Sequence, residues 1–402
     1  MALPFEKLES QVRAMGAALA NRSLTVAEQT RLAIEHLRYL NDLDAIWAQI
    51  MLARQHDAGF RGAGPLGEPI NAAIPLPDCP LSGTVFAADG SQIYPDLHAP
   101  APYWLTNIGV FVYHHGTDQL PDSLVEPQLY YREEDVRDQE GRLIASAAIN
   151  ARRAVYEMQQ LASVVTRYMS TAATPLLALY DGPLIGMPMG KEVGDAAMLT
   201  ADYHEAIDFL FEAGAALAGY VDRPSSRFVV YTIYLMTLTD EEVTRGNLQS
   251  ALLEGLCDAD LYRELLGPGE RSALMIQQSP LNKEYKDRYG DHQEIVFFYL
   301  NTAASHQEPY LARVEIPMWV ARDAALVDAT HALIYAQCQI TDRYPYALTR
   351  ADEIAVVQPA EKRGLDDLIA IELLRNRQTV ASSQKLNTKG LARHGRQQYQ
   401  GT

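Results

Sequence analysis

Two Asp-Gly pairs follow apolar, strand-like runs in this chain of 402 residues. Asp89-Gly90 comes after Thr84–Ala88, and Asp181-Gly182 comes after Pro175–Tyr180. A carboxylate at the carboxyl end of a strand points into the crevice where sheet proteins bind ligands. Asp-Gly is also an ordinary turn signal, and for one pair alone the turn is the stronger interpretation. Two such pairs in one predicted sheet favour a ligand-binding site more than one pair alone would. A turn role for both pairs stays open.

A third carboxylate lies between these pairs in sequence, on a helix predicted over residues 141–168. Glu157 borders the apolar stripe of this helix, and Arg153 lies one turn earlier on the same face. By itself, Glu157 is best interpreted as a surface residue paired with Arg153. If it faces the sheet, three carboxylates converge in one crevice, and a divalent cation would keep them ionised together. An all-oxygen ligand set favours Mg²⁺ or Mn²⁺ over zinc.

The order of these motifs resembles that of the NurA nucleases. The resemblance is carried by FAADGSQIYPD, the helix with Arg153 and Glu157, LYDGPL, GYVDRPSS, LARVEIPMWVA and RYPYALTRADEIAVV. These segments stand in the family's order between residues 80 and 360. The resemblance implies an α/β fold with an RNase H-like mixed β-sheet flanked by helices, here with a helical N-terminal extension and insertions over residues 239–290.

The resemblance also implies a set of metal ligands. In the family, the carboxylates that match Asp89, Glu157 and Asp181 hold two Mn²⁺ ions, and Mg²⁺ is the alternative ion. Where the family usually has a late His, this chain has Asp352. A fourth carboxylate often fills that place in RNase H-like sites. Asp352 is therefore expected to act as a metal ligand or proton acceptor, or else to mark weakened activity.

Four further residues are expected to contact the substrate. A basic residue follows the Gly-Tyr-Val segment in the family, and Arg223 takes that phosphate-contacting role here. Arg153 and Ser91 accompany the expected ligands in sequence. Tyr344 could stack on a base, although a half-buried aromatic in a strand is the simpler interpretation.

The function implied by the resemblance is metal-assisted hydrolysis of DNA phosphodiesters, from 5′ ends and on single strands, in DNA end resection and double-strand break repair. The family works as a homodimer docked on the hexameric translocase HerA. This chain has no GxxxxGK[ST] phosphate loop, so an ATP-driven motor must be another polypeptide. Two alternatives stay open: a NurA-like adaptor that has lost activity with the missing His, and a metal-dependent phosphohydrolase acting on RNA or nucleotides.

Composition narrows the class of protein. The chain carries 51 Asp and Glu against 34 Lys and Arg, a formal net charge of −17. Such acidity argues against a polybasic binder of nucleic acid or anionic lipid, yet a site that contacts phosphate through metal ions needs carboxylates. The three cysteines are scattered without zinc-site spacing. No export signal or membrane-length apolar run is visible, so a cytoplasmic protein with no membrane contact is expected.

The elements that must position these residues follow from hydrophobic periodicity. Three domains are expected: a helical extension with a Gly/Pro-rich linker at 1–80, a nuclease domain at 81–360 and a basic tail at 361–402. Helices are predicted over 5–57 (two), 141–168, 201–220, 248–266 and 322–339. An irregular loop is predicted over 59–83, and strands over 84–88, 103–114, 123–131, 175–180, 228–238, 294–301 and 311–316.

Overall fold

The computed structural model describes residues 5–78, 82–96, 98–138, 140–186, 193–249 and 255–378. The strands are β1 (Ala63–Pro65), β2 (Ala73–Ile74), β3 (Gly83–Ile93), β4 (Trp104–His115), β5 (Asp122–Tyr130), β6 (Leu176–Asp181), β7 (Ala216–Asp222), β8 (Arg271–Ser272), β9 (Met275–Gln277), β10 (Ile295–Asn301) and β11 (Leu311–Pro317). The helices are α1 (Glu9–Leu37), α2 (Leu43–His56), α3 (Glu133–Val136), α4 (Ser146–Tyr168), α5 (Ala196–Glu212), α6 (Phe228–Leu235), α7 (Arg245–Leu248), α8 (Asp258–Leu265), α9 (Pro280–Tyr289), α10 (Met318–Ala321), α11 (Ala324–Ile340), α12 (Tyr346–Ala355) and α13 (Pro359–Arg375).

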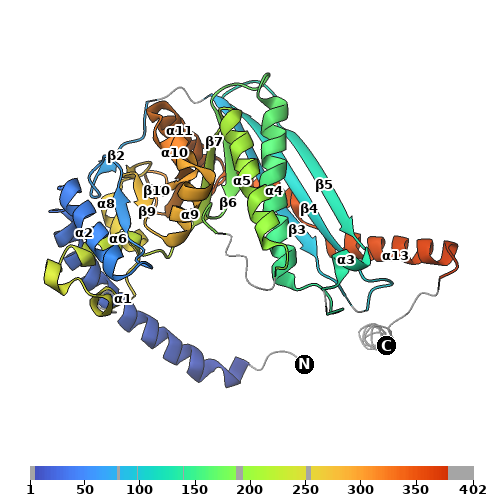
Figure 1. Cartoon of the computed structure of the whole chain (residues 1–402), viewed down its shortest axis with the longest axis horizontal. Helices are drawn as coiled ribbons and strands as arrows, with labels where there is room; N and C mark the ends of the chain where they lie inside the picture. Colours follow the sequence, from blue (N-terminus) through green and yellow to red (C-terminus); the bar gives the residue numbers. More distant parts are fainter. Residues whose placement is uncertain are drawn as a thin grey trace, which may run out of the picture.

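The strands form one mixed sheet with the order β1-β9-β10-β11-β7-β6-β3-β4-β5, and β8 joins β2 to β10 beside this path. At its centre, β3, β4 and β5 pair antiparallel in sequence order, and β6 returns parallel to β3. β7 pairs in parallel with β6. Because parallel neighbours need crossover connections, α4 and α5 connect these strands and lie together over one face of the sheet (Figure 1).

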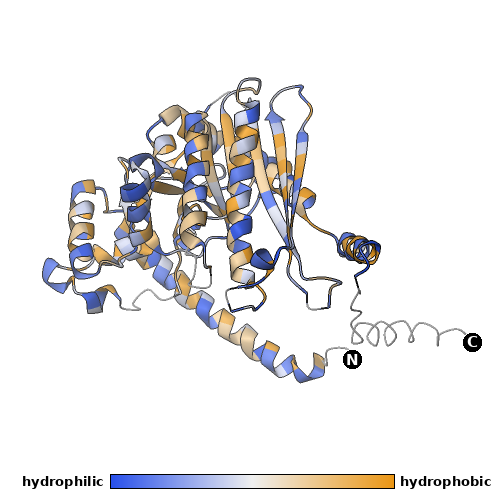
Figure 2. Cartoon of the chain, turned by 45° about the vertical axis from the view of Figure 1, so that its right-hand side comes forward, coloured by the Kyte–Doolittle hydropathy of each residue, from blue (hydrophilic) through white to orange (hydrophobic). Residues whose placement is uncertain are grey.

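Alternate residues of the central strands face opposite layers of helices. On β3, Phe86 and Ala88 pack with α4 and α5, whereas Val85 and Ala87 pack with α11 and α12. Figure 2 shows the central strands as mostly hydrophobic ribbons behind helices of mixed polarity. Burial on both faces explains why β6 forms a continuous apolar run instead of an alternating pattern.

The amino-terminal helices share a core with a later part of the chain. α1 and α2 pack with α6 and α8 against Phe297 and Tyr299 of β10. The segment 59–83, predicted as an irregular loop, contains β1 and β2, which pair with β9 and β8. That prediction was wrong for these residues, since very short strands tolerate Gly and Pro at a sheet margin. The first half of α1 extends away from the body of the molecule (Figure 1).

The predicted fold class, a mixed sheet flanked by helices, is confirmed, and so is the order strand, strand, strand, helix, strand, helix as far as α5, with the short α3 added before α4. Two further segments were assigned wrongly. Residues 216–222 form β7 instead of ending a helix, and most of the predicted strand 228–238 is α6. A short, fully apolar run has no period that separates a buried helix from a buried strand.

Three other predictions differ in extent. β3 does not stop at Asp89 but continues to Ile93, because Gly90 and Ser91 still pair with β4. Of the helix predicted over 248–266, α8 accounts for residues 258–265 and α7 already ends at Leu248, while 250–254 lie outside the described residues. In the predicted tail, α13 reaches Arg375, and 379–402 lie outside the described residues. Within the described residues, no helix combines the length and apolar character needed to cross a bilayer.

Gly109 on β4 lets α12 lie directly on the sheet. A Cβ at this position would lie 2.9 Å from both the Ala351 carbonyl oxygen and the Ala355 nitrogen, which are backbone atoms of α12. An approach this close is possible only where the strand residue has no side chain. Gly109 therefore sets the distance between the sheet and the helix that carries Asp352.

We expect Gly109→Ala to lower the free energy of unfolding by about 1–3 kcal/mol, because the added methyl must push the α12 backbone away from β4. Gly364→Ala on α13 is the matched control, since nothing lies within 4 Å of its added Cβ, and alanine is the better helix former by up to about 1 kcal/mol. Urea denaturation measures both. Equal stability of the Gly109 variant and the wild type would contradict the close packing.

His204 on α5 is buried without charge. Its Nδ1 lies 2.5 Å from Gln293 Oε1, its ring stacks on Tyr289 at a centroid distance of 3.6 Å, and its Nε2 is buried without a hydrogen-bond partner among the described residues. Burial lowers its pKa to about 4, although Gln293 and Asp208 act in the opposite direction. The folded state therefore resists protonation that the unfolded chain accepts near pH 6.5.

This difference makes the protein lose stability as the pH falls from about 6.5 toward 4, where the unfolded state binds the extra proton. Between pH 7 and pH 5, the contribution of His204 amounts to about 2 kcal/mol. We expect His204→Phe to be less stable than the wild type at pH 7 but to lose about 2 kcal/mol less on acidification. Chemical denaturation at both pH values measures the difference, and parallel losses in the two proteins would contradict it.

Candidate active site

Two neighbouring strands end on aspartates at the same edge of the sheet. Asp181 is the last residue of β6, and Asp222 is the last residue of β7. The pairing of β3 with β6 stops at Ala88–Tyr180, so Asp89 lies just beyond the point where β3 loses that neighbour. The carboxyl ends of parallel strands are where open α/β sheets bind ligands. The structure therefore brings Asp89 and Asp181, predicted from two separate Asp-Gly pairs, to one edge.

Asp89 lies on the sheet face that α12 covers, because it alternates in register with Val85 and Ala87. Its Oδ1 accepts a hydrogen bond from the Gly90 N–H at 2.7 Å. Burial raises the pKa of Asp89 to about 6; the Gly90 hydrogen bond opposes this rise, and the charges of Asp181 and Asp352 add to it. Three aspartates thus lie within electrostatic reach of one another.

Glu157 reaches the same place from α4. Its side chain is 5% exposed and accepts from Arg153 Nη1 at 2.5 Å. Burial raises the pKa of Glu157 to about 8; Arg153 lowers it, and the charges of Asp89 and Asp181 raise it further. The tyrosine at the end of β6, Tyr180, also donates its hydroxyl to Glu157. The pairing of Glu157 with Arg153 is confirmed, but Glu157 is buried against the sheet, and Arg153 is only partly exposed.

Gly90 permits this approach of α4. A Cβ on Gly90 would lie 2.6 Å from Glu157 Oε1 and 2.7 Å from Ile108 Cδ1. The carbonyl oxygen of Gly90 accepts from Arg153 Nη1 at 2.7 Å, and the same nitrogen lies 3.9 Å from Asp89 Oδ1. The glycine of the first Asp-Gly pair therefore serves close helix packing inside a strand, and not a turn.

Tyr344 lies just before α12 and donates its hydroxyl to Asp181. Burial raises the pKa of Asp181; the Tyr344 hydrogen bond opposes this rise, and the charges of Asp222 and Asp352 add to it. The Tyr344 ring packs edge-on against Tyr220 of β7, with the ring centroids 5.3 Å apart. Tyr344 is thus a hydrogen-bond donor to a candidate ligand, and its role in stacking on bases stays a prediction.

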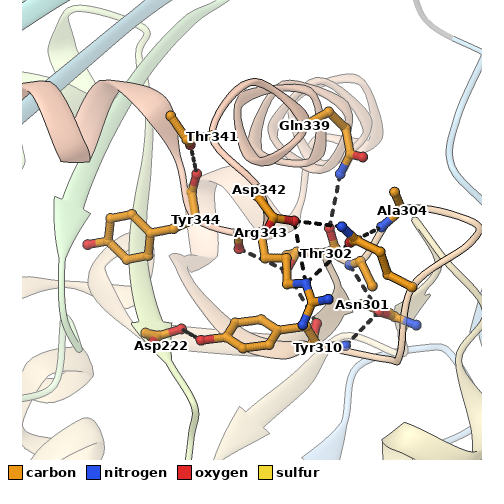
Figure 3. A network of polar contacts seen from close by, with 12 residues as sticks. Asp222, Asn301, Thr302, Ala304, Tyr310, Gln339, Thr341, Asp342, Arg343 and Tyr344 are labelled. Carbon is orange, nitrogen blue, oxygen red and sulfur yellow. Dashed lines mark hydrogen bonds and ion pairs between the residues drawn. The ribbon is translucent and has the colours of Figure 1, made fainter.

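Asp222 is a further carboxylate of this edge that the sequence pattern did not assign. Its Oδ1 accepts from the Tyr310 hydroxyl at 2.7 Å, and Arg343 lies over the Tyr310 ring at 5.7 Å (Figure 3). The signal for Asp222 was the same as for Asp89 and Asp181, an aspartate after the apolar run ALAGYV. It was missed because most of the run before it was assigned to a helix that ended at residue 220.

Asp352 and Ser91 meet the site through α12. Asp352 is exposed on this helix, and its charge contributes to the raised pKa values of Asp89 and Asp181. Ser91 Oγ donates to the Ala355 carbonyl at 2.5 Å and accepts from the Val357 N–H at 3.2 Å. Ser91 therefore ties β3 to the end of α12. A contact between Ser91 and substrate stays a prediction.

Arg223, predicted to contact phosphate, follows β7 at the same edge. Its side chain is 80% exposed, and its Nε donates to Asp222 Oδ2 at 3.1 Å. The residue adopts a positive φ of 43°, a conformation that is uncommon outside glycine, asparagine and aspartate. The structure therefore places a long, exposed cationic side chain beside the aspartates. Its contact with phosphate stays a prediction.

The loop after Asp181 is held by a buried ion pair on β11. Glu315 Oε2 accepts from the Leu184 and Ile185 N–H groups at 2.7 and 3.3 Å. Arg313 Nη2 lies 2.7 Å from Glu315 Oε1, and both side chains are nearly inaccessible to solvent. This pair fixes the chain that leaves β6, and with it the end of the strand that carries Asp181.

The donor chemistry of the cluster suits a hard divalent cation, since every candidate ligand is a carboxylate. Burial and, after it, mutual repulsion raise the pKa values of Asp89, Glu157 and Asp181, so a nearby positive charge would stabilise their ionised forms. In the described part of the chain, no group of three or more His, Cys, Asp and Glu residues is gathered closely enough to hold an ion as it stands. Arg153 lies against Asp89 and Glu157 instead.

Comparisons with solved structures give distant likenesses. The NurA nuclease from Sulfolobus solfataricus aligns with a TM-score of 0.47 at 13% identity, over 84% of this chain and 96% of that one. The catalytic domain of human Endonuclease V gives 0.31 at 12%, over 81% and 98%, and Drosophila Piwi gives 0.28 at 12%, over 69% and 30%. No curated protein matches the chain.

The sequence profile of the NurA domain matches residues 83–357. The matched segment begins with β3 and extends just past α12, so it contains Asp89, Glu157, Asp181, Asp222 and Asp352. It also covers more than half of the 402 residues. This chain therefore belongs to the NurA family of nucleases.

Proposed function

We propose that this protein is a divalent-metal-dependent nuclease that hydrolyses DNA phosphodiesters at the cluster formed by Asp89, Glu157, Asp181 and Asp352. One observation carries the proposal: two strands and two helices bring these acids together at one sheet edge, where burial and then their mutual repulsion raise the pKa values of Asp89, Glu157 and Asp181. The cluster lies inside the segment that matches the NurA domain.

The residues of the cluster would divide the work. Asp89, Glu157, Asp181 and Asp352 would hold Mn²⁺ or Mg²⁺, in a pair of ions if the site follows the family. Two bound metal ions would lower the pKa of a coordinated water and supply positive charge at the scissile phosphate. Tyr344 orients Asp181 through its hydroxyl. Asp352 is exposed on α12, where it can accept a proton from an attacking water.

Two cationic side chains would position the DNA. Arg223 has a long, exposed side chain beside Asp222, and a guanidinium can bind a phosphate with two parallel hydrogen bonds. Arg153 lies in the cluster itself, 26% exposed. Phosphate contacts of this kind fix the strand without reading its sequence. Such a site suits an enzyme that degrades DNA of any sequence.

Family membership supports the wider role that we propose. The protein would act as a 5′–3′ exonuclease and single-strand endonuclease in DNA end resection and double-strand break repair. It would work in the cytoplasm as a homodimer docked on a HerA-type hexameric translocase. The acidic net charge of −17 supports a need for such a partner, because an acidic surface attracts DNA weakly by itself.

We expect Asp89→Asn to reduce Mn²⁺-dependent degradation of 5′-labelled single-stranded DNA by about 100-fold or more, because the amide removes a charge that binds the ion. Asp118→Asn, an exposed aspartate in the turn after β4, is the matched control and should keep full activity. Time courses on denaturing gels measure both rates. Degradation that survives Asp89→Asn, or that needs no divalent ion, would sink the proposal.

Substitution of Asp352 tests its departure from the family's histidine. If Asp352 accepts a proton or binds an ion, Asp352→Asn should lower the rate by about 10–100-fold. Asp352→His should retain most of the wild-type rate, because aspartate and histidine side chains can both act as a base. The rates are measured in the same gel assay. A wild-type protein without activity that gains it through Asp352→His would instead show that the aspartate has weakened the enzyme.

A further inference from the structure

Arg153 is the one cation in direct contact with the cluster acids among the described residues. Its Nη1 contacts Glu157 at 2.5 Å, the Gly90 carbonyl at 2.7 Å and Asp89 at 3.9 Å. Arg153 lowers the pKa of Glu157 and, less strongly, those of Asp89 and Asp181. The guanidinium therefore provides the positive charge that mutually repelling carboxylates require.

The hydrogen bonds of this guanidinium are incomplete. Its Nε is buried and has no hydrogen-bond partner among the residues that the structure describes, although a guanidinium offers five donors. The contacts that hold it run through one nitrogen, Nη1, to a carboxylate and a carbonyl. Arg153 is thus kept in the cluster by charge more than by a full set of hydrogen bonds.

The place that Arg153 takes is the place that a bridging cation would need. An ion held by both Asp89 and Glu157 would lie close to the Arg153 guanidinium, whose Nη1 is 2.5 Å from Glu157 Oε1 and 3.9 Å from Asp89 Oδ1. Two positive charges cannot share these oxygens without strong repulsion in a half-buried site.

We infer that Arg153 is a displaceable internal cation, which holds Asp89 and Glu157 together and must leave them when a divalent ion binds. The inference rests on the proposed metal-dependent function and adds that Arg153 competes with the metal ion for these carboxylates. Its side chain is partly exposed and sits where β3 has lost its neighbour β6, so it has an open route away from the cluster. Arg153 is in this sense a positioning residue that sets the affinity of the ion.

Arg152, the residue just before Arg153 on α4, provides a matched control. Its Nη2 contacts Asp195 at 2.9 Å, and its guanidinium lies 5.9 Å from the Trp104 ring. It is a partly buried arginine of the same helix, paired with a different acid. A general effect of removing a buried charge from α4 would appear in both variants, whereas competition for the ion belongs to Arg153 alone.

The experiment is calorimetric titration of the full-length protein with Mn²⁺ at about pH 8.5, where protons compete little with the ion. We expect Arg153→Gln to bind Mn²⁺ about tenfold more tightly than the wild type, because no cation has to be displaced. Arg152→Gln should bind like the wild type. Arg153→Lys keeps the charge, so its affinity for Mn²⁺ should stay within about threefold of the wild-type affinity. This variant also tests the role of the charge if Arg153→Gln fails to fold.

Thermal unfolding separates this role from a purely structural one. Without metal, Arg153→Gln should unfold at a lower temperature than the wild type, because the carboxylates then repel one another. Saturating Mn²⁺ should stabilise the variant more than the wild type, because tighter binding to the folded state gives a larger shift. A structural role alone would lower stability without tightening binding.

Two different failures are distinguishable. If the wild type binds Mn²⁺ and Arg153→Gln binds with equal or lower affinity, the displacement of Arg153 is refuted while the metal-dependent function stands. If neither the wild type nor Arg153→Gln binds Mn²⁺ or Mg²⁺ at any concentration that leaves the protein folded, the metal-dependent function is refuted and the inference with it.

Discussion

The repulsion between carboxylates at one edge of the sheet is the constraint on which the site depends. Burial and neighbouring negative charges raise the pKa values of Asp89, Glu157 and Asp181. A fold chosen for stability alone would avoid such a cluster, because uncompensated buried charge is costly. Here Arg153 compensates part of it. The protein keeps an unfavourable arrangement at one place and stabilises it with the surrounding packing.

That packing is unusually close on both faces of β3 and β4. Gly90 admits α4 and its Glu157 from one face, and Gly109 admits α12 and its Asp352 from the other. Buried apolar residues on both faces of the central strands hold these helices in place. The buried Arg313–Glu315 pair fixes the chain after β6. Gly90, Gly109 and the Arg313–Glu315 ion pair thus help to set the distances between the acids.

Hydrophobic period and turn chemistry predicted most of the elements around the site, because long helices such as α4 and strands such as β4 carry clear local patterns. The two wrongly assigned segments beside the site share one cause. The apolar runs that became β7 and α6 have no period of their own, so their structure depends on which neighbours bury them. The same error concealed Asp222, since the apolar run before it was assigned mostly to a helix, and an aspartate just after a helix gives no sign of a strand end.

The sequence by itself determined the family and the candidate acids, because an ordered set of local motifs identifies both without knowledge of contacts. Only the tertiary structure decided what surrounds them. It placed Arg153 against Asp89 and Glu157, directed Tyr344 toward Asp181 and engaged Ser91 with α12. These outcomes depend on contacts between segments far apart in the chain. Burial and distance, which set charge interactions, exist only after those segments pack.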